Sequence, residues 1–205
     1  MGDSWTYRLK EARFDRDLAT VTHEIGGGDS AGIRETVRLV TKKPATDADI
    51  EAGGGLTRTG QRRLPLEPRI FEQQLNQGAT LFEFAPFMGA FSELQPGVRW
   101  SKIAGATSSD SINDWRFSGR VAGRERVRVP AGTFEAIKAE LEGQLDISFP
   151  STRDPFSETA ASYQTYSIWF VPELGRAVKY ERRTFNRGRR LLEHEQYELL
   201  SYQLK

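Results

Sequence analysis

The 205-residue chain contains no cysteine and only two histidines. Without thiols it can form no disulfide, no thiolate metal site and no cysteine nucleophile. No stretch approaches the roughly 18 consecutive apolar residues of a transmembrane helix, so we expect no transmembrane segment. No leader precedes Trp5, which already lies in a strand-like stretch. We therefore expect either a cytosolic protein or one whose leader has been removed.

A strong excess of one charge is also absent. The 29 basic and 28 acidic residues leave a net charge of +1, so no overall field favours nucleic acid and we expect no nucleic-acid partner. The length suits a single domain over residues 1–205. Residues 2–6 and 97–101 share the pattern Gly-x-x-Trp-Ser/Thr. This short internal repeat leaves open the alternative that the domain consists of two similar halves, 1–95 and 96–205.

Alternation of apolar and polar residues with a period of two is the dominant pattern and predicts strands. Residues 120–129 place Val121, Val127 and Val129 among arginines, and Pro130 and Gly132 then predict a turn. Residues 134–147 alternate again, with one apolar side and one largely charged side. This run exceeds a usual strand of about 5–6 residues, which predicts a long, twisted antiparallel sheet with one wet face.

The rest of the chain alternates in the same way. Strands are predicted at residues 5–14, 19–25, 33–42, 98–103, 163–171, 176–185 and 191–204, with turns at 15–17 and 26–29. An edge strand is expected near residues 56–62 and a helical turn at 47–52. Pro68 and Gly78 are placed to begin and stop a helix that ends at Gln77. Residues 105–110 and 149–161 are expected to be loops.

Three segments of the second half carry a recognisable pattern: residues 96–100 (PGVRW), 129–136 (VPAGTFEA) and 169–179 (WFVPELGRAVK). Together they resemble an uncharacterised bacterial cell-envelope family that is similar to the lipoprotein-carrier proteins. The resemblance implies a strongly curved antiparallel sheet around helices or a hydrophobic ligand, usually in exported proteins, and it brings no catalytic residues. We therefore predict a mainly β protein: a single large curved antiparallel sheet, a half-barrel or open barrel, with one or two short helices.

Motifs for cofactors are incomplete. Gly26, Gly28 and Ala31 fit a dinucleotide fingerprint, but residues 33–40 alternate as a strand where that motif requires a helix N-terminus. Residues 55–62 have the spacing of a phosphate-binding loop without its lysine and hydroxyl. We expect no cofactor and no metal.

Catalytic signals are equally weak. His194 and the residue after it begin like a zinc-protease motif, but position 198 is Glu198 and the segment alternates as a strand. The nucleophile motif Gly-x-Ser-x-Gly is absent. Glu140, Glu142 and Asp146 share one strand side, where a solvated face balanced by arginines explains them more simply than a carboxylate pair. We expect no enzyme, and an unrecognised hydrolase that uses His23 or His194 is the remaining alternative.

Two groups of residues are candidates for binding. Five of the twelve phenylalanines fall within residues 71–91, a segment that could cover a concave apolar sheet face as permanent core or as a movable lid. With two tryptophans they form the predicted ligand-binding set: Phe71, Phe82, Phe84, Phe87, Phe91, Trp100 and Trp169. An arginine cluster around one turn is the predicted contact for an anion or an acidic partner, with protection of a sheet edge as the alternative. It consists of Arg182, Arg183, Arg187, Arg189 and Arg190.

These observations favour a non-enzymatic bacterial envelope module that binds an apolar, lipid-like molecule or an envelope protein partner on a curved sheet. A structural or assembly domain that acts through its surface is the alternative. The expected location is the periplasm or cell envelope, with the cytoplasm as the alternative.

Overall fold

A computed structural model describes residues 2–30, 32–42, 57–64, 70–74, 80–84, 94–104, 115–145 and 162–205. Most of this backbone is extended, as the alternating sequence predicts. The strands are β1 (Ser4–Glu11), β2 (Arg16–Asp29), β3 (Gly32–Thr41), β4 (Thr57–Leu64), β5 (Ile70–Gln74), β6 (Thr80–Phe84), β7 (Arg99–Ala104), β8 (Trp115–Val129), β9 (Gly132–Leu145), β10 (Tyr163–Val171), β11 (Arg176–Phe185) and β12 (Leu191–Gln203). The helical residues of the described part are two single 3₁₀ turns, η1 (Ala12–Phe14) and η3 (Pro172–Leu174).

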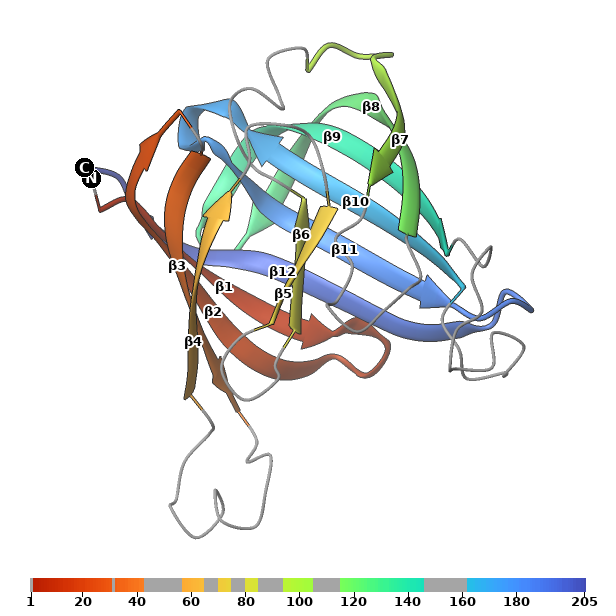
Figure 1. Cartoon of the computed structure of the whole chain (residues 1–205), viewed down its shortest axis with the longest axis horizontal. Coiled ribbons are helices and arrows are strands. Elements are labelled where there is room, and N and C mark those ends of the chain that lie inside the picture. Colours follow the sequence, from red (N-terminus) through yellow and green to blue (C-terminus); the bar gives the residue numbers. More distant parts are fainter. Residues whose placement is uncertain are drawn as a thin grey trace, which may run out of the picture.

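Ten of these strands form one antiparallel sheet, in the order β4-β3-β2-β1-β12-β11-β10-β9-β8-β7. Most neighbours in the sheet are also neighbours in the chain. The first strand instead pairs with the last, β12, through residues from Ser4 to Glu11. This pairing brings the two chain ends together (Figure 1), where the backbone N–H of Lys205 donates to the Asp3 carboxylate at 2.8 Å.

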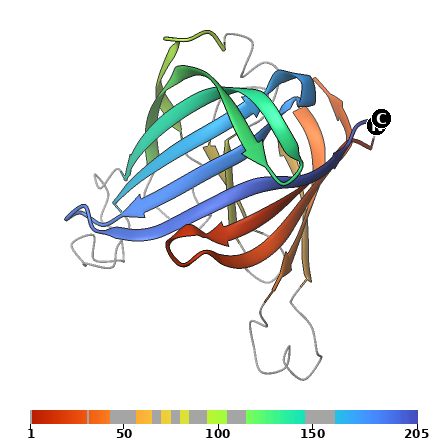
Figure 2. The same ribbon diagram turned by 180° about the vertical axis from the view of Figure 1, so that it is seen from behind.

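The large sheet is strongly curved. Its concave side faces the reader in Figure 1 and points away in Figure 2. Strands β5 and β6 pair with each other as a separate two-stranded sheet. Because this hairpin lies in front of the large sheet in Figure 1 and behind it in Figure 2, it stands on the concave side.

Burial alternates along the strands, as a period of two requires. In β1 every second residue from Trp5 to Glu11 is buried, and in β11 the buried positions run from Arg176 to Thr184. We call this side the inner face of the sheet and the opposite side the outer face. Arg176 of β11 reaches Glu35 of β3 although three strands lie between them, so the inner face is the concave one.

The β8–β9 hairpin bends its tip over the outer face. Between Val121 and Gly123 the register shifts, and Gly123 has a φ of 154°, an irregularity of the kind that bends a strand. Beyond Pro130 the N–H of Ala131 donates to the carbonyl oxygen of Leu199 in β12 at 3.0 Å. Figure 2, seen from the convex side, shows the hairpin crossing in front of the neighbouring strands to reach β12.

The turn predicted at residues 26–29 is wrong, because β2 continues to Asp29. The pairing with β3 shifts register between Ile25 and Gly27, and Gly27 has a φ of 135°. Glycine adopts this positive φ without a side-chain clash. The run of glycines therefore accommodates an irregularity inside the strand instead of ending it.

The helix predicted from Pro68 to Gln77 is also wrong, because its centre is β5. In the β5–β6 pairing Ile70 lies opposite Phe84 and Glu72 opposite Phe82. Backbone pairing with β6 along residues 70–74 stabilises the extended form. Proline and glycine are found at the ends of strands as well as of helices, so their presence at the ends of this segment does not distinguish a strand from a helix.

The mainly β, single curved antiparallel sheet is confirmed. Strands β10 and β11 have the predicted bounds, and the predicted edge strand is β4, at one edge of the sheet. The short helices are reduced, in the described residues, to η1 and η3. The predictions for residues 47–52, 105–110 and 149–161 lie outside the described residues.

Candidate ligand-binding face

A row of apolar side chains crosses the inner face from β2 to β8. Its members are consecutive register partners on seven neighbouring strands, and all of them are buried. The row consists of Ala19, Leu9, Tyr197, Tyr180, Ile168, Ala139 and Val121. We call it the apolar belt. Each belt residue occupies one of the inward-facing positions of its strand. Because side chains alternate between the two faces, the alternating sequence places these apolar residues in one row.

Two tyrosines form the middle of the apolar belt. The rings of Tyr180 and Tyr197 stack with centroids 4.3 Å apart and an interplanar angle of 11°. They are register partners on β11 and β12. Stacked rings of this kind present a broad apolar surface.

A buried ion cluster, the Arg176 cluster, lies at one end of the inner face. The Arg176 guanidinium pairs with one carboxylate oxygen of Glu35, and the other oxygen lies 3.2 Å from His23 Nδ1. These three side chains are 2%, 0% and 6% exposed. The guanidinium lies 4.7 Å from the centroid of the Trp5 ring, and Tyr7 packs edge-on against His23. The buried charge of Arg176 is therefore stabilised by the Glu35 carboxylate and by the face of the Trp5 ring.

A second ion cluster, the Arg182 cluster, lies on the inner face toward the other end. Arg182 Nη2 lies 2.6 Å from Glu195 Oε2 and 3.4 Å from Glu193 Oε2. Burial raises the pKa of the Glu195 carboxyl even though Arg182 acts to lower it. Burial acts to lower the pKa of Arg182, but the nearby acidic groups of Glu195, Tyr166, Tyr197 and Glu193 together raise that pKa above its ordinary value. The apolar belt therefore has a buried polar group on either side.

Three of the predicted ligand-binding phenylalanines lie in the hairpin on the concave side. Phe71 is in β5, and Phe82 and Phe84 are in β6. In the register of this hairpin Phe71 lies opposite Glu83, Phe82 opposite Glu72 and Phe84 opposite Ile70. Phe87 and Phe91 lie outside the described residues.

The two predicted tryptophans are not brought together. Trp100 lies in the edge strand β7, opposite Gly119. Trp169 lies on the outer face, between Lys138 and Lys179 in the sheet register, and its indole N–H donates to Glu125 of β8. Trp169 is therefore buried under the β8–β9 hairpin and is not part of the apolar belt.

The five predicted arginines divide into three environments. Arg182 is buried in its own cluster, and Arg183 pairs on the outer face with Glu181 at 3.0 Å. Only Arg187, Arg189 and Arg190 occupy the exposed turn between β11 and β12. The Arg189 guanidinium lies 3.9 Å from the centroid of the Tyr163 ring.

The histidines and carboxylates considered for catalysis are dispersed. His23 is in the Arg176 cluster, while His194 Nε2 lies 3.5 Å from Glu181 on the outer face. Glu140 accepts from Arg120 at 2.8 Å, which holds its carboxyl pKa below the usual value. Within the described residues no group of three or more His, Asp or Glu side chains stands where it could share a metal ion.

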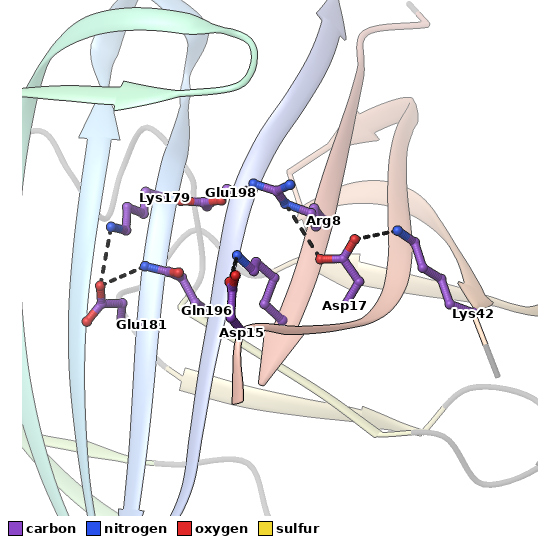
Figure 3. Close-up of polar contacts among 9 residues, drawn as sticks. Arg8, Asp15, Asp17, Lys42, Lys179, Glu181, Gln196 and Glu198 are labelled. Carbon is purple, nitrogen blue, oxygen red and sulfur yellow. Dashed lines mark hydrogen bonds and ion pairs between the residues drawn. The ribbon is translucent and has the colours of Figure 1, made fainter. Parts of the chain in front are cut away.

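The outer face carries a series of ion pairs on four neighbouring strands, from β11 to β2, and on Lys42, the residue that follows β3 (Figure 3). Three groups of contacts compose it. They are Lys179 to Glu181 with Gln196, Glu198 to Arg8 to Asp17 to Lys42, and Lys10 to Asp15. We call it the outer ladder. Many charged side chains on the solvent-facing side of the sheet are therefore paired with one another across strands.

Sequence reasoning missed the Arg176 cluster, although a signal was present. Glu35 falls on the same strand parity as Ile33, Val37 and Leu39, which predicts an inward-facing position for a charged residue. A carboxylate at such a position requires a buried partner. Its partner, Arg176, is 141 residues away, so the pairing could not be read from local spacing.

Comparisons with known proteins add a likeness of fold. No protein-family model and no curated protein sequence matches the chain. Among solved structures, a candidate lipoprotein from Parabacteroides distasonis superposes with a TM-score of 0.50 at 13% identity, covering 98% of this chain and 95% of its own. A candidate exported protein with a YmcC-like fold from Bacteroides fragilis gives 0.45 at 12% identity, covering 99% and 96%. At this identity the first likeness shows the fold alone. Within the described residues, no helix is both long enough and apolar enough to cross a membrane.

Proposed function

We propose that this protein is a non-enzymatic module of the bacterial cell envelope that binds an apolar ligand, or an apolar segment of a protein partner, on the apolar belt. One observation carries the proposal. Seven consecutive register partners make an unbroken apolar row on the concave side of the sheet, and a self-paired hairpin stands on that same side.

The hairpin β5–β6 is suited to act as a cover. Its strands hydrogen-bond with each other and belong to a sheet of their own. Moving it therefore breaks no strand pairing of the large sheet. Since the belt residues are buried in this structure, a ligand reaches them when the cover moves.

The polar groups on either side suit a ligand with an apolar body and a polar end. The Arg176 cluster and the Arg182 cluster hold charged side chains next to the belt. Lipid-like molecules have this chemistry. The likeness of fold to a protein named as a candidate lipoprotein supports the envelope location.

Access to the belt can be measured with single cysteines, because the native chain has none. Ala139→Cys places a thiol in the belt, and Glu142→Cys places one on the exposed side of the same strand. A binding face predicts that Cys at position 139 reacts slowly with a maleimide under native conditions and is protected further by a long-chain fatty acid. The thiol at position 142 should react fast with or without the fatty acid.

Native mass spectrometry provides the second readout. Binding predicts a co-purifying mass of lipid size, or its appearance after equilibration with the fatty acid. A bare protein mass in both cases, together with a thiol at 139 that reacts only when the protein unfolds, contradicts the proposal.

That contrary result favours the alternative, a structural or assembly domain that acts through its surface. One observation favours this alternative. Every member of the apolar belt is already buried, as it would be in a permanently filled core. Hydrolytic activity that disappears on replacement of His23 or His194 would instead indicate an enzyme.

A further inference from the structure

Two turns at one end of the sheet form a basic surface, which we call the arginine rim. One turn covers residues 12–16 and includes η1, and the other covers residues 186–190, between β11 and β12. They lie at the same end because Glu11, the last residue of β1, pairs with Glu195 near the start of β12. Figure 1 shows both turns at the end of the sheet that is remote from the chain termini.

The arginine rim has an excess of positive charge. The rim contains five arginines and one acid, Asp15, and Glu11 immediately precedes it. Both acids are already held, Glu11 by Arg13 at 2.8 Å and Asp15 by Lys10. Among the described contacts, Arg16, Arg189 and Arg190 have no carboxylate partner. The overall charge balance of the chain therefore conceals a local basic surface.

The arginine rim also presents an exposed aromatic side chain. Phe14 is 68% exposed, more than any other exposed large apolar residue of the described part. The turn holds it in place, because Glu11 caps η1 and Asp15 closes it in the left-handed conformation with a φ of 46°. The Arg13 guanidinium lies 5.1 Å from the centroid of the Phe14 ring. An outward aromatic among arginines is the composition that binds a membrane surface, with the ring in the interface and the cations at the headgroups.

We propose that the arginine rim docks on an anionic lipid bilayer, with Phe14 inserted at the headgroup level. This inference concerns a different surface from the apolar belt and does not depend on ligand binding there. A groove that stacks nucleic-acid bases needs several aromatic side chains along a basic path, whereas the rim presents one exposed phenylalanine.

A second group of arginines in the chain provides the comparison. Arg124, Arg126 and Arg128 are exposed on the β8–β9 hairpin, toward the opposite end of the sheet. There Glu125 and Glu135 stand among them, and Arg126 pairs with Glu135 at 3.8 Å. Among the described residues of that hairpin, no large apolar side chain is exposed as Phe14 is. The arginine rim therefore differs from this second group both in its larger excess of positive charge and in its exposed aromatic side chain.

The test measures binding of the full chain, tagged at its C-terminus, to vesicles of phosphatidylglycerol and phosphatidylcholine. The tag lies away from the rim, since the chain ends meet at the other end of the sheet. We expect binding that requires phosphatidylglycerol and falls with added salt. The triple variant R187A/R189A/R190A should bind roughly 100-fold more weakly, because each arginine near an anionic surface contributes about fivefold. The matched variant R124A/R126A/R128A removes the same charge and should change binding less than threefold.

A spectroscopic readout tests the insertion itself. Phe14→Cys and Arg126→Cys each provide a unique thiol for an environment-sensitive fluorophore. The label at position 14 should shift to the blue on phosphatidylglycerol vesicles, and the label at position 126 should not.

Three results overturn the proposal: no dependence on anionic lipid, equal losses in the two triple variants, or a label at position 14 that stays in water. Binding to a DNA duplex as tight as to the vesicles, with the same dependence on the rim arginines, also overturns it in favour of a general polyanion site. Reactivity of the thiol in Ala139→Cys should be unaffected by R187A/R189A/R190A, so failure of this proposal is distinguishable from failure of the proposed function.

Discussion

Arg176 and Glu35 form a buried ion pair that joins β11 to β3 across the concave side of the sheet. The two residues are 141 positions apart in the chain, and three strands separate them in the sheet. A flat sheet would hold them far apart, since neighbouring strands are spaced about 4.8 Å. The contact therefore depends on the curvature and, in turn, stabilises it.

Replacing Glu35 with leucine should destabilise the protein by about 3–5 kcal/mol, because it leaves the buried Arg176 charge without its carboxylate. The free energy of unfolding in urea measures this loss. The double variant E35L/R176M should recover most of it, since neither charge then remains buried. Glu135→Gln, at the exposed pair with Arg126, is the control and should leave the urea midpoint unchanged. A double variant no more stable than E35L would contradict the account.

Trp169 should act as a local clamp for the tip of the β8–β9 hairpin. Trp169→Phe keeps an aromatic ring but removes the indole N–H that donates to Glu125. A hydrogen bond to a charged group contributes about 1.5–3 kcal/mol. We expect the Ala131 amide, which donates to Leu199, to exchange its hydrogen roughly 10- to 100-fold faster. Amides between β1 and β12 should keep their protection, and uniform acceleration over both regions would show that the clamp is not local.

The outer ladder should make stability depend on pH in the acid range. Burial alone would raise the pKa of Glu181, but Lys179 and Arg183 hold it below its usual value. A carboxyl with a lowered folded-state pKa stabilises the fold above its unfolded pKa, about 4.3 for glutamate. That stability is lost as the pH falls through the folded-state pKa. The unfolding midpoint of Glu181→Gln should therefore fall less between pH 6 and pH 3 than that of the native protein. Identical pH profiles would show that Glu181 makes no such contribution.

Much of the sheet could be predicted from the sequence because side-chain direction in a strand depends only on parity. Ile137, Ala139 and Leu141 were predicted on one side, and all three are buried. The same rule applies to Trp169, which was grouped with the predicted ligand-binding residues. Its neighbours Ile168 and Phe170 point to the inner face, so parity already directs Trp169 outward.

The parts that could not be predicted depend on contacts between distant segments. The alternating pattern predicts that Glu35 faces inward, but it does not identify the cation that pairs with it. The curvature that brings Arg176 to Glu35 involves the whole sheet. The arginine rim is a similar case. Phe14 and Arg189 belong to turns 175 residues apart, and only the pairing of the first strand with the last places those turns at one end of the sheet.

Gly175 should be required by the turn between β10 and β11. It closes η3 in the left-handed region, with φ of 60° and ψ of 20°, and its N–H donates to the Pro172 carbonyl oxygen at 3.0 Å. A Cβ at this position would meet no atom within 4 Å, so any cost of Gly175→Ala comes from the backbone, at about 1–2 kcal/mol. Gly188→Ala is the matched control, because Gly188 lies in an exposed turn without a positive φ and its Cβ would make an ordinary contact. Thermal unfolding should show a lower midpoint for G175A and an unchanged or slightly higher one for G188A, since alanine restricts the unfolded chain. Equal midpoints for the two variants would mean that the left-handed conformation at Gly175 does not govern this turn.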